Sequence, residues 1–419
     1  MTIFRSSIFH TPANAFTTPD ALVALEDGAL AIESGKIAAC NDFGTVCALY
    51  PDALVRDLRD GCILPGFIDT HIHFPQVRVM GGLGYSLLDW LERLTLPEEA
   101  KFSDITYART VADEFVRNLA AHGTTTALVF GAHFAGATAV LFEAAAQKGL
   151  RVVSGLVLSD RLLRSDILQT PEAAYRDSRQ LIERIRGRRR LGYAVIPRFA
   201  LSASEPMLEV CRALLEENPE LLFTTHINEN IREIEEVSRQ FPWAADYLAV
   251  YEKFGLISGR SVLAHNVHTT DSQLQRLAES GASVAHCPCS NAALGSGIFP
   301  LRRHVEGGVR VVLGTDVGGG TGFGMLKEAL QAYLLQRVGP DPMTLTAAQM
   351  LYLATRAGAE AMNLADSIGD FTPGKSADFV YLRAPMPDRR LGLSEIVTLA
   401  DSSWIKRVYV EGESVHDIG

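Results

Sequence analysis

Between residues 67 and 316 the chain alternates between short apolar, β-branched runs and segments with helical periodicity. One such segment, YARTVADEFVRNLAAHG, ends at Gly123, where a helix C-terminal cap is expected. Strands separated mostly by helices favour a parallel (β/α)₈ barrel, with a doubly wound sheet as the alternative. The eight expected strands are residues 67–73, 124–130, 151–158, 193–200, 221–227, 261–266, 282–287 and 310–316.

Both ends of the chain are rich in β-forming residues instead. Two apolar runs meet at Ser34-Gly35, and a second pair meets at Glu411-Gly412, which predicts two β-hairpins. Neither end is long enough to bury a sheet well alone. We therefore expect residues 1–66 and 369–419 to pair into one small β domain, with the barrel of residues 67–368 inserted between them.

Composition limits the setting of the protein. The formal net charge of −10 argues against a broad nucleic-acid or acidic-membrane surface, because such surfaces need clustered Lys and Arg. The most apolar window, residues 127–146, contains His133 and Glu143 and is typical of a buried strand and helix rather than of a membrane span. Six cysteines are too sparse for a disulfide framework. No signal peptide is recognisable, so a cytoplasmic enzyme is expected.

Polar residues stand at the ends of several expected strands, and in a (β/α)₈ barrel all these ends converge on one mouth. The residues are His71 and His73 (first strand), Arg198 (fourth), His226 (fifth), His265 (sixth), His286 (seventh) and Asp316 (eighth). Side chains that are far apart in the sequence are therefore predicted to meet at one site.

The pair His71-x-His73 indicates a metal site. Two residues apart on a strand, both imidazoles project to the same side and can converge on one ion. His226 and Asp316 would complete a set of three nitrogens and one oxygen, which suits zinc, although iron or manganese can occupy such sites. Asp316 could instead be a turn residue before the glycines that follow it, but a buried carboxylate is costly unless it is paired or bound to metal. Arg198 stands where a carboxylated lysine would bridge two metals, so one ion is predicted.

Three further residues surround this predicted centre. Glu229 follows His226 by three residues, on a loop that opens a helix, and is a candidate general acid/base; a favourable helix N-terminal charge is the alternative. His265 is either a fourth nitrogen ligand or, as we favour, a group that hydrogen-bonds the metal-bound water. His286 is expected to form a wall of the substrate site, and His268 to lie on the solvated surface.

Several stretches of the sequence carry a family resemblance. PGFIDTHIHFPQ (65–76) resembles the signature of the amidohydrolase superfamily. SLLDWLERLTLPEE (86–99), PRFALS (197–202), THINEN (225–230), HCPCSNAALGSG (286–297) and LGTDVGGG (313–320) are similar to the guanine deaminase family within it.

The resemblance implies a (β/α)₈ barrel with a flanking β-sandwich, one zinc ion and a homodimer. It implies zinc ligands at His71, His73, His226 and Asp316. It makes Glu229 and Asp316 the proton-transfer pair, and it makes Gln76, Arg198 and Phe199 the lining of a pocket for a small purine base, bordered also by His226 and Glu229.

These assignments lead to a hypothesis for the reaction. The ion activates one water, Asp316 accepts its proton and His265 orients it, while Glu229 protonates the ring nitrogen next to C2 of guanine. Arg198 can donate to the O6/N7 edge. Phe199 and Trp90 can offer flat apolar surface, with an ordinary core role as the alternative for Trp90. The alternatives are a deaminase of another heterocycle, such as an oxidised guanine, and a scaffold protein that has lost catalysis. The second is disfavoured because no ligand is missing.

Overall fold

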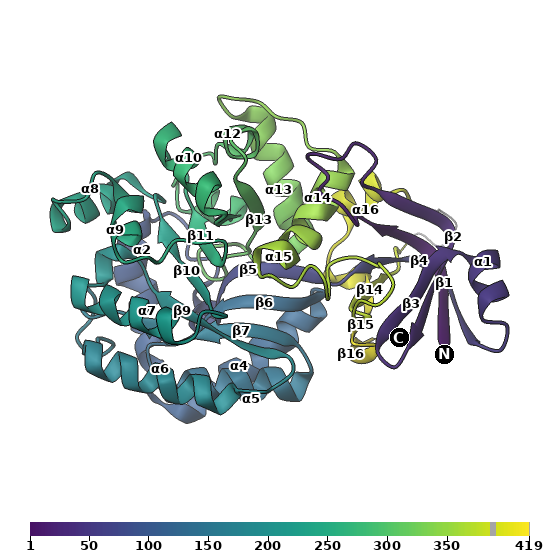
Figure 1. The fold of residues 1–419 in the computed structure, drawn as a ribbon, viewed down its shortest axis with the longest axis horizontal. Coiled ribbons are helices and arrows are strands. Elements are labelled where there is room, and N and C mark those ends of the chain that lie inside the picture. The colour runs from purple at the N-terminus through teal and green to yellow at the C-terminus, as the bar shows by residue number, and fades with distance from the viewer. Residues whose placement is uncertain (386–390, 419) are drawn as a thin grey trace.

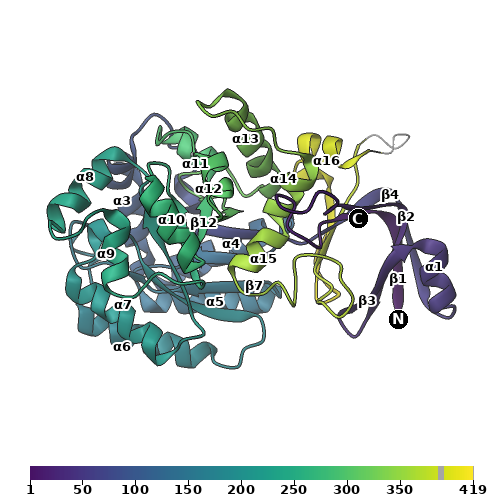
Figure 2. The same ribbon diagram turned by 45° about the horizontal axis from the view of Figure 1, so that its top comes forward.

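The structure is a computed structural model that describes residues 1–385 and 391–418. Its larger part is the predicted parallel barrel, and its smaller part is a separate sheet built from both chain ends (Figure 1, Figure 2). The barrel strands pair in the order β13-β12-β11-β10-β9-β7-β6-β5, with β8 beside β9. They are β5 (Phe67–His73), β6 (Thr124–Phe130), β7 (Arg151–Gly155), β8 (Val157–Leu158), β9 (Leu191–Pro197), β10 (Leu222–Ile227), β11 (Ser261–His265), β12 (Ser283–His286) and β13 (Arg310–Leu313).

The barrel is closed between its first and last strands by contacts at the end of β13 and just beyond it. Thr70 Oγ1 donates to the carbonyl of Leu313 at 2.8 Å, and the amide of Asp316 donates to the carbonyl of His71 at 2.8 Å. The amide of His73 donates to Val317 at 3.2 Å. This closure places Asp316 directly beside the two histidines of β5.

Three expected strands differ from the observed ones by more than one residue or by a break. The run 193–200 is displaced to Leu191–Pro197, so Arg198 and Phe199 lie just after β9. The run 151–158 is split into β7 and β8 at Leu156, whose amide donates to the Tyr193 hydroxyl at 3.2 Å instead of to a strand. The run 310–316 ends at Leu313, because the chain turns away from the extended conformation and reaches φ 48° at Asp316.

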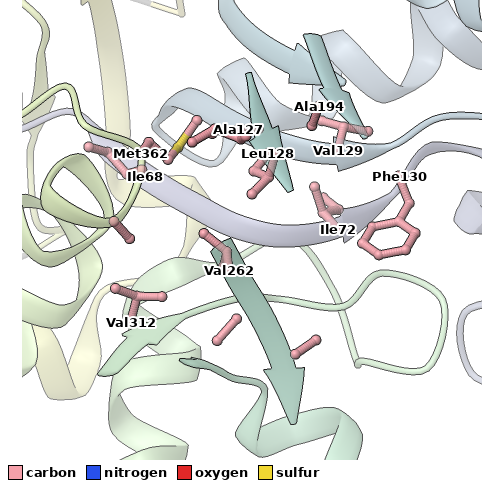
Figure 3. Packing of buried hydrophobic residues seen from close by; sticks show 14 of the residues in the cluster. Ile68, Ile72, Ala127, Leu128, Val129, Phe130, Ala194, Val262, Val312 and Met362 are labelled. Carbon is pink, nitrogen blue, oxygen red and sulfur yellow. The ribbon is translucent and has the colours of Figure 1, made fainter. Parts of the chain in front are cut away.

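The strands are buried on both faces, which is why they read as almost continuous apolar runs. Ile68, Ile72, Leu128, Val262 and Val312 pack together in one buried cluster (Figure 3). This close-packed interior forms a rigid support beneath the carboxyl ends of the strands.

Helices alternate with the barrel strands, as predicted. Gly123 follows α4 with φ 79°, so its predicted role as a helix terminator is confirmed. At the start of α8, Glu233 accepts from the amides of Glu229 and Asn230 at 3.1 and 3.2 Å and completes a capping box. The helices of seven or more residues around the barrel are α4 (Ile105–Ala121), α5 (Ala135–Lys148), α6 (Pro171–Ile185), α7 (Glu205–Glu217), α8 (Ile231–Gln240), α9 (Tyr247–Lys253), α10 (Asp271–Ser280), α13 (Met325–Val338), α14 (Ala347–Ala354) and α16 (Leu393–Leu399).

The two chain ends form one sheet, which confirms the separate β domain. Its strand order is β16-β15-β14-β4-β1-β2-β3, and the antiparallel pairing of β14 with β4 joins the C-terminal part to the N-terminal part. The rings of Phe4, Phe379 and Tyr409 cluster on one face with centroids 4.3–5.5 Å apart. The strands are β1 (Thr2–His10), β2 (Val23–Glu33), β3 (Lys36–Asp42), β4 (Leu54–Pro65), β14 (Phe379–Leu382), β15 (Ile405–Val410) and β16 (Glu413–Asp417).

Both predicted hairpins are present, and their turns lie against each other. Glu33 pairs with Lys36, and Val410 pairs with Glu413, across turns whose central residues all have positive φ. Ala377 bridges the turns, since its amide donates to Gly35 at 3.0 Å and its carbonyl accepts from Gly412 at 2.9 Å. The two ends of the chain are therefore joined at their turns as well as along the sheet.

Across the described residues, 1–385 and 391–418, no helix has the length and apolar character needed to cross a membrane. All six cysteines are free thiols.

Because the two turns are in contact, we expect a methyl group added at Gly35 to lower the free energy of unfolding more than one added at an open turn. Gly35 and Gly187 have almost equal φ (77° and 76°), but a Cβ at Gly35 would lie 2.7 Å from the carbonyl oxygen of Glu411, whereas a Cβ at Gly187 meets nothing within 4 Å. We expect Gly187→Ala to cost about 1 kcal/mol from backbone strain and Gly35→Ala about 1–3 kcal/mol more. Thermal unfolding of both variants measures the difference, and equal losses would contradict it.

Candidate active site and metal centre

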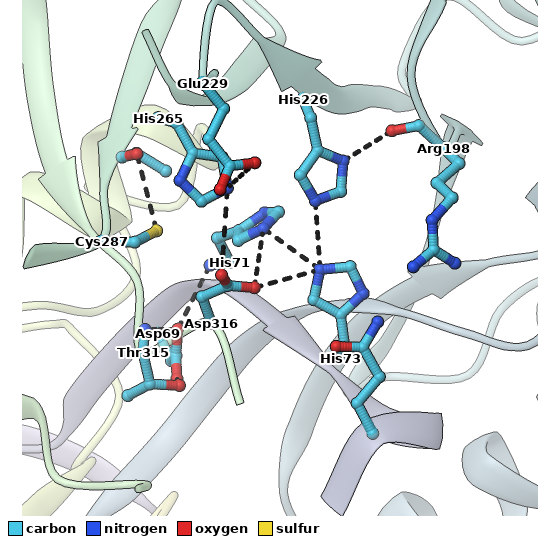
Figure 4. Close-up of polar contacts among 12 residues, drawn as sticks. Asp69, His71, His73, Arg198, His226, Glu229, His265, Cys287, Thr315 and Asp316 are labelled. Carbon is cyan, nitrogen blue, oxygen red and sulfur yellow. Dashed lines mark hydrogen bonds and ion pairs between the residues drawn. The ribbon is translucent and has the colours of Figure 1, made fainter. Parts of the chain in front are cut away.

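Five side chains named from the sequence lie together at the carboxyl end of the barrel (Figure 4). His71 and His73 lie on β5, His226 on β10, His265 at the end of β11, and Asp316 just after β13. All five are buried. The convergence of strand ends thus brings them together from distant parts of the sequence.

The separations of four donor atoms match one tetrahedral centre. His73 Nε2 lies 3.3 Å from His71 Nε2 and 3.2 Å from His226 Nε2. Asp316 Oδ1 lies 3.4 and 3.2 Å from the Nε2 atoms of His71 and His73. Ligand bonds of 2.0–2.1 Å in tetrahedral geometry put neighbouring donors about 3.3–3.4 Å apart. These residues therefore fit a single tetrahedrally bound ion.

The protonation of His226 supports this fit. Its Nδ1 lies 2.6 Å from the carbonyl oxygen of Arg198, which can only accept, so Nδ1 carries the hydrogen. Burial, and then the nearby rings of His71 and His73, lower the pKa of His226 well below its usual value, so the ring is neutral. Its Nε2 therefore directs a bare lone pair toward the nitrogens of β5, as a metal ligand must.

His265 lies on the other side of Asp316. Its Nε2 is 3.9 Å from Asp316 Oδ2 and 3.4 Å from Glu229 Oε2, and its Nδ1 bonds to Asn291 Oδ1 at 2.9 Å. One donor atom of His265 lies within 4.8 Å of donor atoms of His71, His226 and Asp316. His265 is therefore the alternative to His73 as a ligand. His73 Nε2 lies 3.2 Å from an oxygen of Asp316, whereas His265 Nε2 lies 3.9 Å from one, and this difference favours His73 as the fourth ligand.

Backbone strain is concentrated at these strand ends. Asn228, His265 and Asp316 have φ of 50°, 74° and 48°, in the left-handed region that residues other than glycine rarely adopt. Such strain persists only where the surrounding structure enforces it, and it is common at functional sites. Here it turns the chain sharply where the side chains enter the barrel mouth.

Asp69 supports the metal centre from below and had not been singled out in the sequence. Its carboxylate accepts from Thr315 Oγ1 at 2.5 Å, from the Thr315 amide at 3.1 Å and from the His71 amide at 3.2 Å. Burial raises the pKa of Asp69 to about 7. Since it links β5 to the segment that carries Asp316, it fixes both sides of the donor set.

Glu229 lies on the loop between β10 and α8, as predicted, and faces the same centre (Figure 4). It is buried, and its Oε1 accepts from Ser296 Oγ at 3.2 Å. Burial, followed by the charge of Asp316, raises the pKa of Glu229 to about 8. A carboxyl group with this pKa can hold a proton near neutral pH and deliver it to a bound molecule.

A small cavity opens above these residues. The expected pocket residues Gln76, Arg198 and Phe199 all line it, as do His226 and Glu229. Its remaining lining residues are His73, Leu87, Trp90, Leu91, His265, Leu294 and Asp316. Leu87, Leu91 and Leu294 were not identified from the sequence, because an apolar residue in a loop or short helix carries no signal of its own.

Two polar residues behind the cavity wall were also missed. Glu99 accepts from Gln76 Nε2 at 2.8 Å and from Arg198 Nη1 at 2.6 Å. His133 is buried, with Nδ1 3.3 Å from Glu99 Oε2. In the sequence, Glu99 looks like an ordinary acidic residue in a short helix, α3 (Leu96–Ala100).

The structure contradicts two other expectations. His286 does not line the cavity; it is buried and stacks on Phe299 with centroids 4.3 Å apart. Its position at a strand end was misleading, because it packs against the ring of Phe299. His268 is half-buried rather than solvated, with Nε2 2.8 Å from the carbonyl oxygen of Ser296.

Comparison with known proteins agrees with this arrangement. The chain is 55% identical to a probable guanine deaminase of Deinococcus radiodurans, over 98% of each chain. Its fold matches the structure of Escherichia coli guanine deaminase with a TM-score of 0.96 and 38% identity over the whole of both chains. It matches a guanine deaminase from C. acetobutylicum, solved with guanine in the active site, with a TM-score of 0.92 and 26% identity over 99% of each chain.

The family comparison gives the broader assignment. The amidohydrolase family matches residues 62–415, which include every strand of the barrel and all the residues of the site described above. The metal-ligand geometry, the barrel and the full-length relatives agree with the resemblance noted in the sequence. The chain belongs to the amidohydrolase family.

Proposed function

We propose that this protein hydrolyses guanine to xanthine and ammonia. The observation that carries the proposal is that one cavity joins the donor cluster, the carboxyl group of Glu229, whose pKa is raised to about 8, and the polar pair Arg198 and Gln76. Full-length relatives named as guanine deaminases support the choice of substrate. An oxidised guanine is the alternative substrate.

His71, His73, His226 and Asp316 would hold the metal, with zinc as the proposed ion and iron as the alternative. A divalent ion bound there supplies Lewis-acid polarisation and lowers the pKa of a water molecule. Three imidazole nitrogens and one carboxylate oxygen suit zinc, and these four ligands are enough to bind one ion. Arg198, which stands where a bridging lysine would be needed, supports one ion rather than two.

The protons are moved by two carboxyl groups. Asp316 accepts the proton of the attacking water, and Glu229 gives its proton to the ring nitrogen next to C2. The water oxygen bonds to C2, the bond from C2 to the exocyclic amino nitrogen breaks, and the amino group leaves as ammonia with the proton that Asp316 returns to it. The proton left on the C2 oxygen passes to the Glu229 carboxylate, which gives the 2-oxo group of xanthine and restores the acid. His265 lies between the two carboxyl groups, 3.4 Å from Glu229 and 3.9 Å from Asp316, and is placed to orient the water.

The base is recognised by the cavity wall. Arg198 has donors to spare beyond its contact with Glu99 and suits the O6/N7 acceptor edge of guanine. Gln76 faces another edge of the ring, and Phe199 offers a flat apolar surface beside His226, with centroids 6.2 Å apart. We further propose a homodimer, for which the family resemblance is the support, and a cytoplasmic location.

Glu229→Gln tests the proton donor. Glutamine keeps the shape of the side chain but cannot donate a proton as an acid, so kcat for xanthine formation should fall by about 10²–10⁴-fold. Glu235→Gln, on the exposed side of α8, is the matched control and should keep full activity. Full activity of Glu229→Gln would remove this residue from the chemistry.

The choice of substrate is tested by ammonia release from guanine, 8-oxoguanine, adenine and cytosine. Guanine should be turned over, and Arg198→Ala should lower kcat/KM for it by about 10–100-fold, because charged hydrogen bonds to the base are lost. Turnover of adenine or cytosine by a wild-type protein that leaves guanine untouched would overturn the proposed function.

Metal content separates the two candidate ligand sets. His73→Ala should lower the metal content of the purified protein from about one ion per chain to less than about a tenth of that and should lower the unfolding temperature. His416→Ala changes a histidine of β16, outside the site, and should keep its metal. Full metal occupancy in His73→Ala would return His265 to the place of fourth ligand.

A further inference from the structure

Two of the polar groups that line the cavity are held from behind by one carboxylate. Glu99 is 3% exposed, and it receives Arg198 Nη1 on Oε2 at 2.6 Å and Gln76 Nε2 on Oε1 at 2.8 Å. His133 Nδ1 lies 3.3 Å from the same Oε2. Gln76, Arg198 and His133 come from three distant segments, and Glu99 is the group that they share.

The charge of Glu99 determines how each neighbour must face it. Burial alone would raise the pKa of Glu99, but Arg198 and His133 outweigh it and hold the pKa below its usual range. An ionised carboxylate only accepts hydrogen bonds, so every group that faces it has to donate. The Gln76 amide therefore turns its nitrogen to Glu99 and keeps its oxygen away from it.

This arrangement sets the hydrogen-bonding character of the cavity wall. Gln76 uses one of its two amide N–H groups on Glu99, and this orientation leaves its oxygen, on the side away from Glu99, as an acceptor. Arg198, anchored through one nitrogen, is left with its other N–H groups as donors. A heterocycle that presents both a ring N–H and a carbonyl oxygen satisfies this pair, whereas a ring with only unprotonated nitrogens leaves the acceptor unpaired.

We propose that Glu99 is a positioning residue that fixes the donor–acceptor pattern of the pocket and so selects purines with an oxo group over those without one. The proposal rests on the proposed deamination of guanine and adds the basis of its selectivity. Glu99 does not line the cavity and takes no proton from the substrate. It acts through Arg198 and Gln76.

The His133 side of the carboxylate makes this position rigid. His133 Nε2 lies 3.4 Å from Ser159 Oγ, which in turn lies 3.0 Å from Ser202 Oγ. All of these side chains are buried. Glu99 is thus fixed by a chain of polar contacts across the interior, and it transmits a fixed orientation to the cavity wall.

The test compares Glu99→Gln with Glu98→Gln in deamination of guanine and of 2-aminopurine, which lacks the oxo group. An amide at position 99 can donate as well as accept, so the Gln76 amide is no longer fixed. We expect KM for guanine to rise at least about tenfold with a smaller change in kcat, and the ratio of kcat/KM for guanine over 2-aminopurine to fall by a similar factor. Glu98, whose carboxylate bonds Lys101 at 2.6 Å, is the neighbouring control and should change neither value.

Two further variants keep the test decisive. Glu99→Asp retains the charge and should give a smaller rise in KM. Gln76→Leu removes the acceptor but leaves Glu99 in place, and it should lower the preference for guanine over 2-aminopurine. It serves as the test if Glu99→Gln does not fold. Unchanged KM and unchanged substrate ratio in these variants would overturn the inference while wild-type activity on guanine still stands. A wild type that is inert toward guanine would overturn the proposed function as well.

Discussion

The closure of the barrel is the constraint on which the site depends. The amide of Asp316 bonds the carbonyl of His71 at 2.8 Å, so the chain after the last strand is fixed to the middle of the first. This closure brings a carboxylate from position 316 beside the imidazoles at positions 71 and 73. The strained φ of Asp316 is the cost of that approach, and the bonds from Asp69 to Thr315 and to the His71 amide hold both sides in place.

Buried charge is the second organising feature of the site. Isolated ionised groups are costly to bury, so each carboxyl group here has partners that set its charge. Arg198 and His133 keep Glu99 ionised, whereas burial leaves Glu229 able to hold a proton near neutral pH. Carboxyl groups at one cavity thus differ in role because their neighbours differ. Glu99 is thus set to anchor its neighbours and Glu229 to transfer a proton before any ligand binds.

The parts predicted from the sequence were those with a repeating pattern. The alternation of strands and helices gave the barrel, and the positions of His226 and Asp316 at strand ends led to the metal cluster. Glu99 and Asp69 were missed because their importance comes from neighbours more than twenty residues away, such as Gln76 for Glu99 and Thr315 for Asp69. His286 was misplaced for the opposite reason, since a strand-end position does not reveal that Phe299 covers the ring.

The central claim is that three imidazoles and one carboxylate hold a single ion. X-ray absorption spectroscopy at the metal edge of the purified protein tests it most directly. We predict one ion per chain, with nitrogen and oxygen ligands at about 2.0–2.2 Å and the multiple-scattering signature of imidazole. Sulfur scattering near 2.3 Å, which would bring in Cys287 or Cys289, or a second metal about 3.5–4 Å from the first would contradict it.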